Sequence, residues 1–213
     1  MRDHKFIKGE FYHVYIHAIE GRNLFNDTED YERFLTTLFA ANGSKSIPRI
    51  DSQNYLNLVW DIRDGDMDVG ESMVDIVGFC CNPTHAHLIL GEREDGNISK
   101  FMHKFQVSYA KYYNIKHDRR GHLFERNFNS KHLQDNEYLL SVSCYVHLNP
   151  KDIKEWSGKE YLYPWSSYQD YAIKNRWGRL LKTSIVLSQF NNNDEYKLFV
   201  EQHKDSDPVE VSR

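Results

Sequence analysis

The chain has 213 residues and a net charge of −4; 40% of its residues are hydrophobic and 14% are aromatic. This composition excludes a disordered chain and predicts one globular domain with an extension. The three cysteines include an adjacent pair, which excludes a disulfide framework and favours a reducing compartment. Since no run approaches the roughly 20 apolar residues that span a bilayer, we expect a soluble, cytoplasmic protein with no membrane partner.

The first third of the chain predicts a strand, a helix and a segment of weak pattern. Aromatic and β-branched residues over 11–19 are typical of a strand. Asp27 or Thr28 can cap a helix that continues through Ala41, where apolar residues form one stripe. Residues 44–72 are harder to assign; 55–61 is compatible with a strand, and an exposed acidic loop follows it.

The middle of the chain predicts two strands and a long helix. Residues 73–80 and 84–91 are rich in apolar and β-branched residues, and a turn containing Asn, Pro and Thr separates them. Residues 99–116 place apolar side chains on one side and lysines on the other, as an amphipathic helix does. The segment 121–133 has mixed spacing and is interpreted as an irregular strand or hairpin.

Helices dominate the prediction for the last third. Asp135 can cap a helix over 137–148, which an Asn-Pro pair ends, and a short helix is expected over 167–173. The pattern then weakens, so we place a domain over 1–175 and a partly acidic extension over 176–213. Interleaved strands and helices with short links predict an α+β fold, with a mostly antiparallel sheet and packed helices.

A basic stretch covers residues 100–131, although the chain as a whole is acidic. It holds eight lysine and arginine side chains against two acidic ones. Such a stripe can bind a phosphate backbone, and aromatic rings within it can stack on unpaired bases. The alternative is a solvated helix face without a ligand. The candidate DNA contacts are Lys100, Lys104, Lys111, Arg119, Arg120, Phe124, Arg126 and Lys131.

Two histidines, His85 and His87, lie two positions apart in the strand predicted at 84–91. Residues i and i+2 of a strand point to the same face, so the two imidazoles would lie side by side. They can be packed residues with internal hydrogen bonds, metal ligands, or part of a histidine triad. The triad needs a third histidine at the position of Ile89, which removes that interpretation.

A second candidate pair, Tyr145 and Asn149, follows in the predicted helix at 137–148. The two residues are four positions apart and would share one helix face. A tyrosine hydroxyl, with a pKa of about 10, is a poor nucleophile unless a cation lies close. A metal held by the two histidines and Asn149 would orient a phosphate for attack by Tyr145. Carboxylate or amide oxygens as ligands suit Mg²⁺ or Mn²⁺.

Several segments of the chain are similar, in order, to segments of one known family. They are Asn82–Ile89 (NPTHAHLI), Gly96–Met102 (GNISKFM), Tyr109–Asn114 (YAKYYN), Gly121–Phe128 (GHLFERNF), Tyr145–Pro150 (YVHLNP) and Tyr163–Tyr168 (YPWSSY). Together they resemble the HUH single-tyrosine transposases, and most closely the REP-associated tyrosine transposase branch. In that family a histidine–hydrophobe–histidine motif binds the metal.

The resemblance implies a ferredoxin-like catalytic domain over 1–175 that nicks DNA and transfers strands. Tyr145 would attack hairpin-forming, single-stranded DNA and become joined to the 5′ phosphate, leaving a free 3′ hydroxyl. His85 and His87 would hold a divalent cation, Mg²⁺ or Mn²⁺, with Asn149 as the third ligand. The partner would be single-stranded or hairpin DNA, and the protein would be nucleoid-associated. Related enzymes include monomers and homodimers.

Two other functions remain open at this point. A domesticated relative would keep the fold and bind structured single-stranded DNA or RNA without cutting it. A metal-dependent phosphoesterase that uses water as its nucleophile would turn over without forming a protein–DNA adduct.

Overall fold

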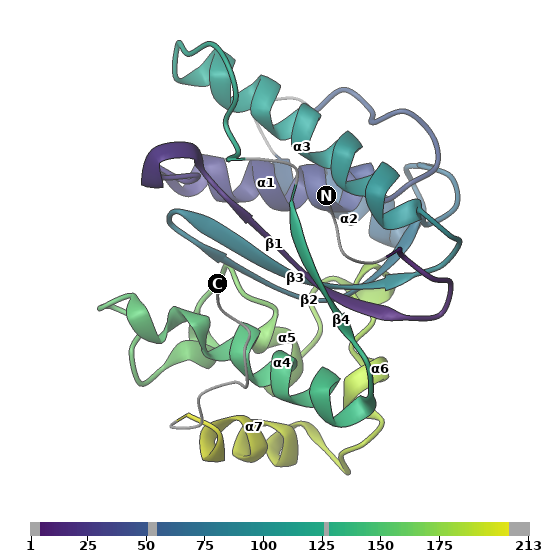
Figure 1. Ribbon diagram of the computed structural model, residues 1–213, viewed down its shortest axis with the longest axis vertical. Helices are drawn as coiled ribbons and strands as arrows, with labels where there is room; N and C mark the ends of the chain where they lie inside the picture. Colours follow the sequence, from purple (N-terminus) through teal and green to yellow (C-terminus); the bar gives the residue numbers. More distant parts are fainter. Residues whose placement is uncertain (1–4, 51–54, 126–127, 205–213) are drawn as a thin grey trace.

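A four-stranded sheet lies at the centre of the molecule (Figure 1). The computed structural model describes residues 5–50, 55–125 and 128–204. Within these ranges the neighbouring strands are all antiparallel, and their order across the sheet is second, third, first, fourth. The strands are β1 (Phe11–His17), β2 (Val74–Asn82), β3 (His85–Glu92) and β4 (Asn129–Leu133).

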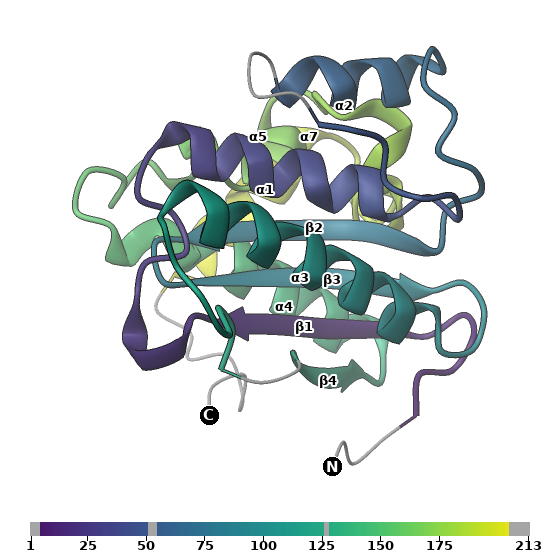
Figure 2. The ribbon, with the colours of Figure 1, turned by 90° about the horizontal axis from the view of Figure 1, so that it is seen from above.

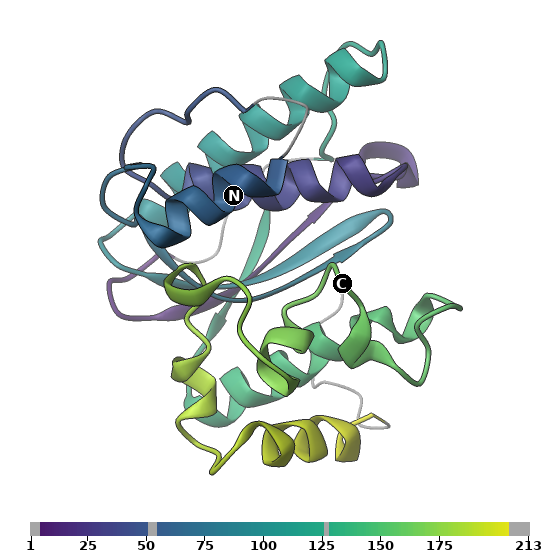
Figure 3. The same cartoon turned by 180° about the vertical axis from the view of Figure 1, so that it is seen from behind.

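Helices cover both faces of this sheet (Figure 1, Figure 3). The helices of the described residues are α1 (Thr28–Ala41), α2 (Tyr55–Asp64), α3 (Asn97–Lys116), α4 (Asn136–Leu148), α5 (Tyr168–Ala172), α6 (Ser184–Leu187) and α7 (Asn193–Gln202), together with the 3-10 helices η1 (Ile19–Gly21), η2 (Asn149–Asp152), η3 (Glu160–Leu162) and η4 (Gly178–Leu180). None of the helices in the described ranges is long and apolar enough to cross a membrane.

The connections between the strands identify the topology. α1 lies between β1 and β2 in the chain, and α3 lies between β3 and β4. Both helices lie on one face of the sheet, side by side in Figure 2, while α4, α5 and α7 lie on the other face. This arrangement, with strand order β2-β3-β1-β4, is ferredoxin-like. The predicted α+β class with an antiparallel sheet and packed helices is therefore confirmed.

The strand considered at 55–61 is wrong, because these residues belong to helix α2. Tyr55, Val59 and Ile62 are its buried residues, and their spacing is that of one helix face. Because the polar residue Asn57 interrupts the apolar run, the local pattern alone does not distinguish a strand from a helix here. Packing beside α1 buries the helical stripe and so selects the helix.

The C-terminal segment of the described chain packs onto α4 and α5 (Figure 3). Here the sequence pattern missed helix α7, whose Tyr196 and Val200 are fully buried. The Asn192 side chain caps this helix by accepting from the Glu195 N–H at 2.9 Å, and Asn-x-x-Glu is a helix-start signal. The domain boundary at residue 175 stays a prediction, although side chains on both sides of it share one core.

Asp135 caps α4, as predicted, and accepts a hydrogen bond from the Tyr138 N–H at 2.7 Å. Replacing it with alanine leaves that N–H without its partner. We expect Asp135→Ala to lower the free energy of unfolding by about 1 kcal/mol, measured by urea denaturation. The neighbouring variant Gln134→Ala, at an exposed position outside the helix, should leave it unchanged. Equal stability of all three proteins would contradict the capping role.

Candidate active site

The histidine pair of β3 faces helix α4. The rings of His85 and His87 lie side by side, with centroids 5.0 Å apart, as expected for one face of a strand. The ring of Tyr145 meets the His87 ring edge-on, with centroids 5.2 Å apart and planes at 82°. The fold therefore brings the predicted nucleophile against the predicted metal ligands.

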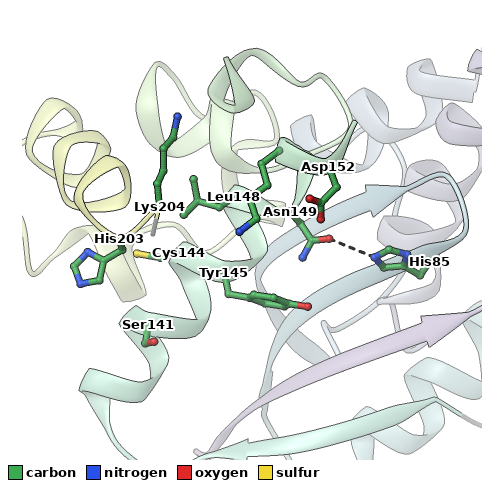
Figure 4. A pocket seen from close by; sticks show the side chains of 10 residues that line it. His85, Ser141, Cys144, Tyr145, Leu148, Asn149, Asp152, His203 and Lys204 are labelled. Atoms are coloured by element: carbon green, nitrogen blue, oxygen red, sulfur yellow. Dashed lines mark hydrogen bonds between the residues drawn. The ribbon is translucent and has the colours of Figure 1, made fainter. Parts of the chain in front are cut away.

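Asn149 ends α4 on the side of His85 (Figure 4). Its Oδ1 lies 3.3 Å from His85 Nε2. Asn149 keeps helical dihedral angles as the C-cap, so the spacing of one helix turn from Tyr145 is preserved. Pro150 follows within the tighter 3-10 turn η2, where its missing N–H is tolerated. The predicted i, i+4 pair thus reaches one site.

A residue that the sequence interpretation treated as part of a turn also belongs to this site. Asn82, at the end of β2, is buried, and its Nδ2 lies 3.1 Å from His85 Nε2. The same amide group donates to Asn149 Oδ1. The electropositive amide of Asn82 therefore lies between two atoms that could both bind a cation. It would have to turn away when a cation binds.

A third histidine supports the pair from the neighbouring strand. His13 of β1 is fully buried, and its Nε2 lies 2.9 Å from His87 Nδ1. In the β1–β3 register, Tyr15 lies opposite His87 and His17 opposite His85, so this sheet face is rich in histidine. The alternation of His13, Tyr15 and His17 in the sequence was a signal that they share a face.

Burial sets the charge state of these groups. It lowers the pKa of His87 well below its ordinary value, and the nearby rings of His13 and His85 lower it further. Burial also lowers the pKa of His85, although the hydrogen bond to Asn149 opposes this. Burial raises the pKa of Tyr145, again opposed by Asn149. The imidazoles are therefore neutral, with lone pairs available, and the phenol is protonated.

Two imidazoles and an amide oxygen are groups that can bind a divalent cation. Among the described residues, no group of three or more His, Cys, Asp and Glu side chains is arranged to hold a metal ion. A cation here would be held by His85, His87 and the amide oxygen of Asn149, with water completing its coordination. No hydrogen bond within the described ranges occupies His87 Nε2, whereas Nδ1 is engaged by His13. That pattern is the one expected of a metal-binding histidine.

A cavity of about 270 Å³ opens beside Tyr145 (Figure 4). His203 and Lys204 line it, so the segment after α7 also contributes to the site, although Lys204 pairs with Glu160 at 3.1 Å. The cavity therefore combines basic groups with the predicted nucleophile. Its lining includes His85, Tyr145, Asn149, Lys151, Asp152, His203 and Lys204.

Most of the candidate DNA contacts lie elsewhere. Lys100, Lys104 and Lys111 belong to α3, which lies on the face of the sheet opposite α4, the helix that carries Tyr145 (Figure 1). The ammonium of Lys104 donates to two backbone carbonyl groups, one of them that of Gly43. Lys100 and Lys111 are exposed. The active site and this basic helix could thus contact the same DNA only if the DNA extends around the edge of the sheet.

The remaining candidates differ in their surroundings. Phe124 is only 9% exposed and packs near Tyr109, which leaves little of its ring for stacking on a base. Lys131 of β4 lies over the ring of Tyr138 on α4, with 5.7 Å between Nζ and the ring centroid, and therefore shares the Tyr145 face. Three arginines complete the set: Arg119 donates to Asn114 Oδ1 at 3.2 Å, Arg120 is exposed, and Arg126 lies outside the described residues.

Two comparisons with known proteins found similarities to this chain. The model of the family described as "Transposase IS200 like" matches residues 69–149, a range that holds all four predicted catalytic and metal-binding residues. The resemblance to these transposases is confirmed over that range. None of the curated proteins matches the chain. A solved structure described as "Structure of the REP associates tyrosine transposase bound to a REP hairpin" is similar, with 14% identity and a TM-score of 0.48, covering 79% of this chain and 82% of that chain.

Proposed function

We propose that this chain is a metal-dependent transposase that nicks single-stranded DNA and transfers strands through a covalent phosphotyrosine. The observation that carries the proposal is the edge-on contact of Tyr145 with His87, beside the Asn149 amide oxygen and His85 Nε2. These four residues lie within the range that matches the IS200-like transposases. They meet within a single chain, so the proposed site needs no second copy.

In the proposed step, the Tyr145 hydroxyl oxygen attacks the phosphorus of a phosphodiester. The phenol proton passes to water, a bond forms between the phenolic oxygen and the 5′ phosphate, and the bond to the 3′ oxygen breaks. The 3′ oxygen takes up a proton and leaves as a hydroxyl group. Attack of a 3′ hydroxyl on the phosphotyrosine reverses these changes and joins the strands.

The residues around Tyr145 have separate tasks. His85, His87 and Asn149 would hold a divalent cation, Mg²⁺ or Mn²⁺, whose charge would neutralise the non-bridging phosphate oxygens. α4 holds Tyr145 against the sheet, so its hydroxyl approaches the phosphate from a fixed direction. Since burial raises the pKa of Tyr145, the phenol is protonated at rest and must lose its proton during attack.

The substrate that fits this proposal is hairpin-forming, single-stranded DNA. The similar solved structure is bound to a REP hairpin, which suggests the same class of ligand here. Lys131, His203 and Lys204 lie on the Tyr145 side of the sheet and can approach the phosphates of the cleaved strand. Such a protein would act on chromosomal DNA in the cytoplasm, associated with the nucleoid.

The test is cleavage of labelled hairpin oligonucleotides in the presence of Mn²⁺. We expect a protein–DNA species that survives denaturing electrophoresis, disappears in excess chelator and returns when Mn²⁺ is restored. His85→Ala should reduce its formation by more than about 100-fold, because a direct ligand matters at least as much as its supporting partners.

Each alternative predicts a different outcome of the same experiment. Full adduct formation in excess chelator would contradict the metal role of His85. Cleavage without an adduct would favour a phosphoesterase that uses water. Hairpin binding without cleavage would favour the non-catalytic relative that binds structured DNA or RNA.

A further inference from the structure

The proposed chemistry does not use the contact between His13 and His87. Both side chains are buried, with exposed fractions of 0% and 4%, and 2.9 Å separates Nε2 of His13 from Nδ1 of His87. The rings are nearly parallel, at 17°, with centroids 5.1 Å apart. The Nδ1 atom of His13 is buried and has no hydrogen-bond partner among the described residues. The two rings therefore form an isolated pair with one shared hydrogen bond.

The shared hydrogen bond links the proton positions of the two rings. A neutral imidazole carries one ring proton, so one nitrogen donates and the other accepts. When His87 Nδ1 donates, His87 Nε2 keeps a lone pair. When His13 Nε2 donates, the proton of His87 must lie on Nε2, which then cannot bind a cation. Only the first arrangement is compatible with a metal ligand at His87.

We propose that His13 is a positioning residue for the cation site: its Nε2 accepts the Nδ1–H of His87 and keeps the His87 Nε2 lone pair directed at the cation. This inference rests on the proposed function. His13 thus takes the place that a carboxylate or a backbone carbonyl occupies behind most metal-binding histidines. His13 is not itself a ligand, because His87 occupies its Nε2.

The same arrangement couples cation binding to the proton position on His13. With Nε2 accepting, the His13 proton lies on Nδ1, where it is buried without a partner. Without a cation, both arrangements leave one N–H and one lone pair unsatisfied, and neither is strongly preferred. A cation at His87 Nε2 satisfies that lone pair and selects the arrangement in which His13 accepts.

Nuclear magnetic resonance of the full chain with ¹⁵N-labelled histidine tests the pair directly. We expect a scalar coupling across the hydrogen bond between His13 Nε2 and His87 Nδ1, already in the metal-free protein. With Zn²⁺ as a diamagnetic probe, the shared proton should lie on His87 Nδ1. Absence of the coupling, or a proton on His87 Nε2 in the Zn²⁺-bound protein, would overturn the proposal.

Two substitutions at His13 separate the contribution of the hydrogen bond from that of side-chain packing. His13→Leu removes the acceptor and should weaken Mn²⁺ binding, measured by calorimetry, by about 10- to 100-fold. His13→Gln places an amide oxygen near the former Nε2 and should restore most of the affinity. His132→Leu removes a sheet histidine that bonds to Glu10 and should bind Mn²⁺ like the unmodified chain.

The outcomes distinguish this inference from the proposed function. Unchanged Mn²⁺ affinity in a folded His13→Leu variant overturns the positioning role and leaves the transposase proposal intact. Equal loss in His13→Leu and His13→Gln also overturns it, because the hydrogen bond would then not be the cause. A parent chain that binds no Mn²⁺ contradicts the proposed function, and the coupling in the metal-free protein still decides whether the pair exists.

Discussion

Replacing Tyr145 with phenylalanine should abolish the covalent protein–DNA adduct. Phenylalanine keeps the ring contacts with His87 and His13, at centroid distances of 5.2 and 5.9 Å, but lacks the oxygen that would bond to phosphorus. We expect adduct formation to fall by about 10⁴-fold or more, below detection on a denaturing gel. Hairpin binding, measured by fluorescence anisotropy, should be unchanged because no charged group is removed.

Tyr138 provides a matched control on the same helix. Its hydroxyl is buried and has no hydrogen-bond partner within the described part of the chain, so Tyr138→Phe removes the same atom from a position away from the cavity. This variant should form the adduct at the normal rate. An adduct in Tyr145→Phe would show that another residue is the nucleophile. Equal loss in both variants would show that α4 is disturbed rather than that chemistry is removed.

The protein should lose stability in mild acid, and His147 is a main cause. His147 is fully buried on α4, and its ring nitrogens lie 2.6 Å from the Tyr196 hydroxyl and 2.8 Å from Ser167 Oγ. Burial lowers the pKa of His147 to about 3, and burial lowers that of His13 to about 3 as well. The pKa of His87 is also lowered well below its ordinary value. Three buried histidines therefore resist protonation in the folded protein.

The sign of the effect follows from proton uptake. In the unfolded chain each histidine has a pKa of about 6.5, so below that pH the unfolded state binds more protons than the folded state. Stability is therefore lost as the pH falls from about 6.5 towards the folded-state pKa. Each group contributes about 1.4 kcal/mol per pH unit, so at pH 5 His147 and His13 together lower the free energy of unfolding by roughly 4 kcal/mol, and His87 acts in the same direction.

Urea denaturation at pH 7, 6 and 5 measures this loss. The variant His147→Leu should be less stable at pH 7, because the hydroxyls of Tyr196 and Ser167 lose a partner. The variant's stability should also depend less steeply on pH, because its unfolded state takes up about one proton fewer than that of the parent chain. A free energy of unfolding that stays constant between pH 7 and pH 5 would contradict the neutral, buried state of these histidines.

The sequence was most informative where structure depends on near neighbours. Period-two alternation correctly placed His85 and His87 on one strand face, and helical spacing correctly placed Tyr145 and Asn149 together. The cap at Asp135 was also recognised, because a cap needs only its own first turn. The ordered motifs indicated a resemblance to the transposases, and the family described as "Transposase IS200 like" matches residues 69–149.

The sequence alone could not determine the contacts between segments that lie far apart in the chain. His13 meets His87 only because β1 pairs with β3 in one register, and Asn82 reaches Asn149 only because α4 packs across the end of β2. Likewise, α3, the helix that carries the lysines, lies on the sheet face opposite α4, the helix that carries Tyr145.

The physical reason is that the periodicity of a helix or a strand depends only on residues that are close together in the chain. Strand register and the choice of sheet face are decided by burial of apolar surface over the whole chain. By itself, therefore, the sequence determined the chemical groups of the site and their spacing within single elements. Only the tertiary structure determined which of these groups meet, and it added the buried histidine behind His87.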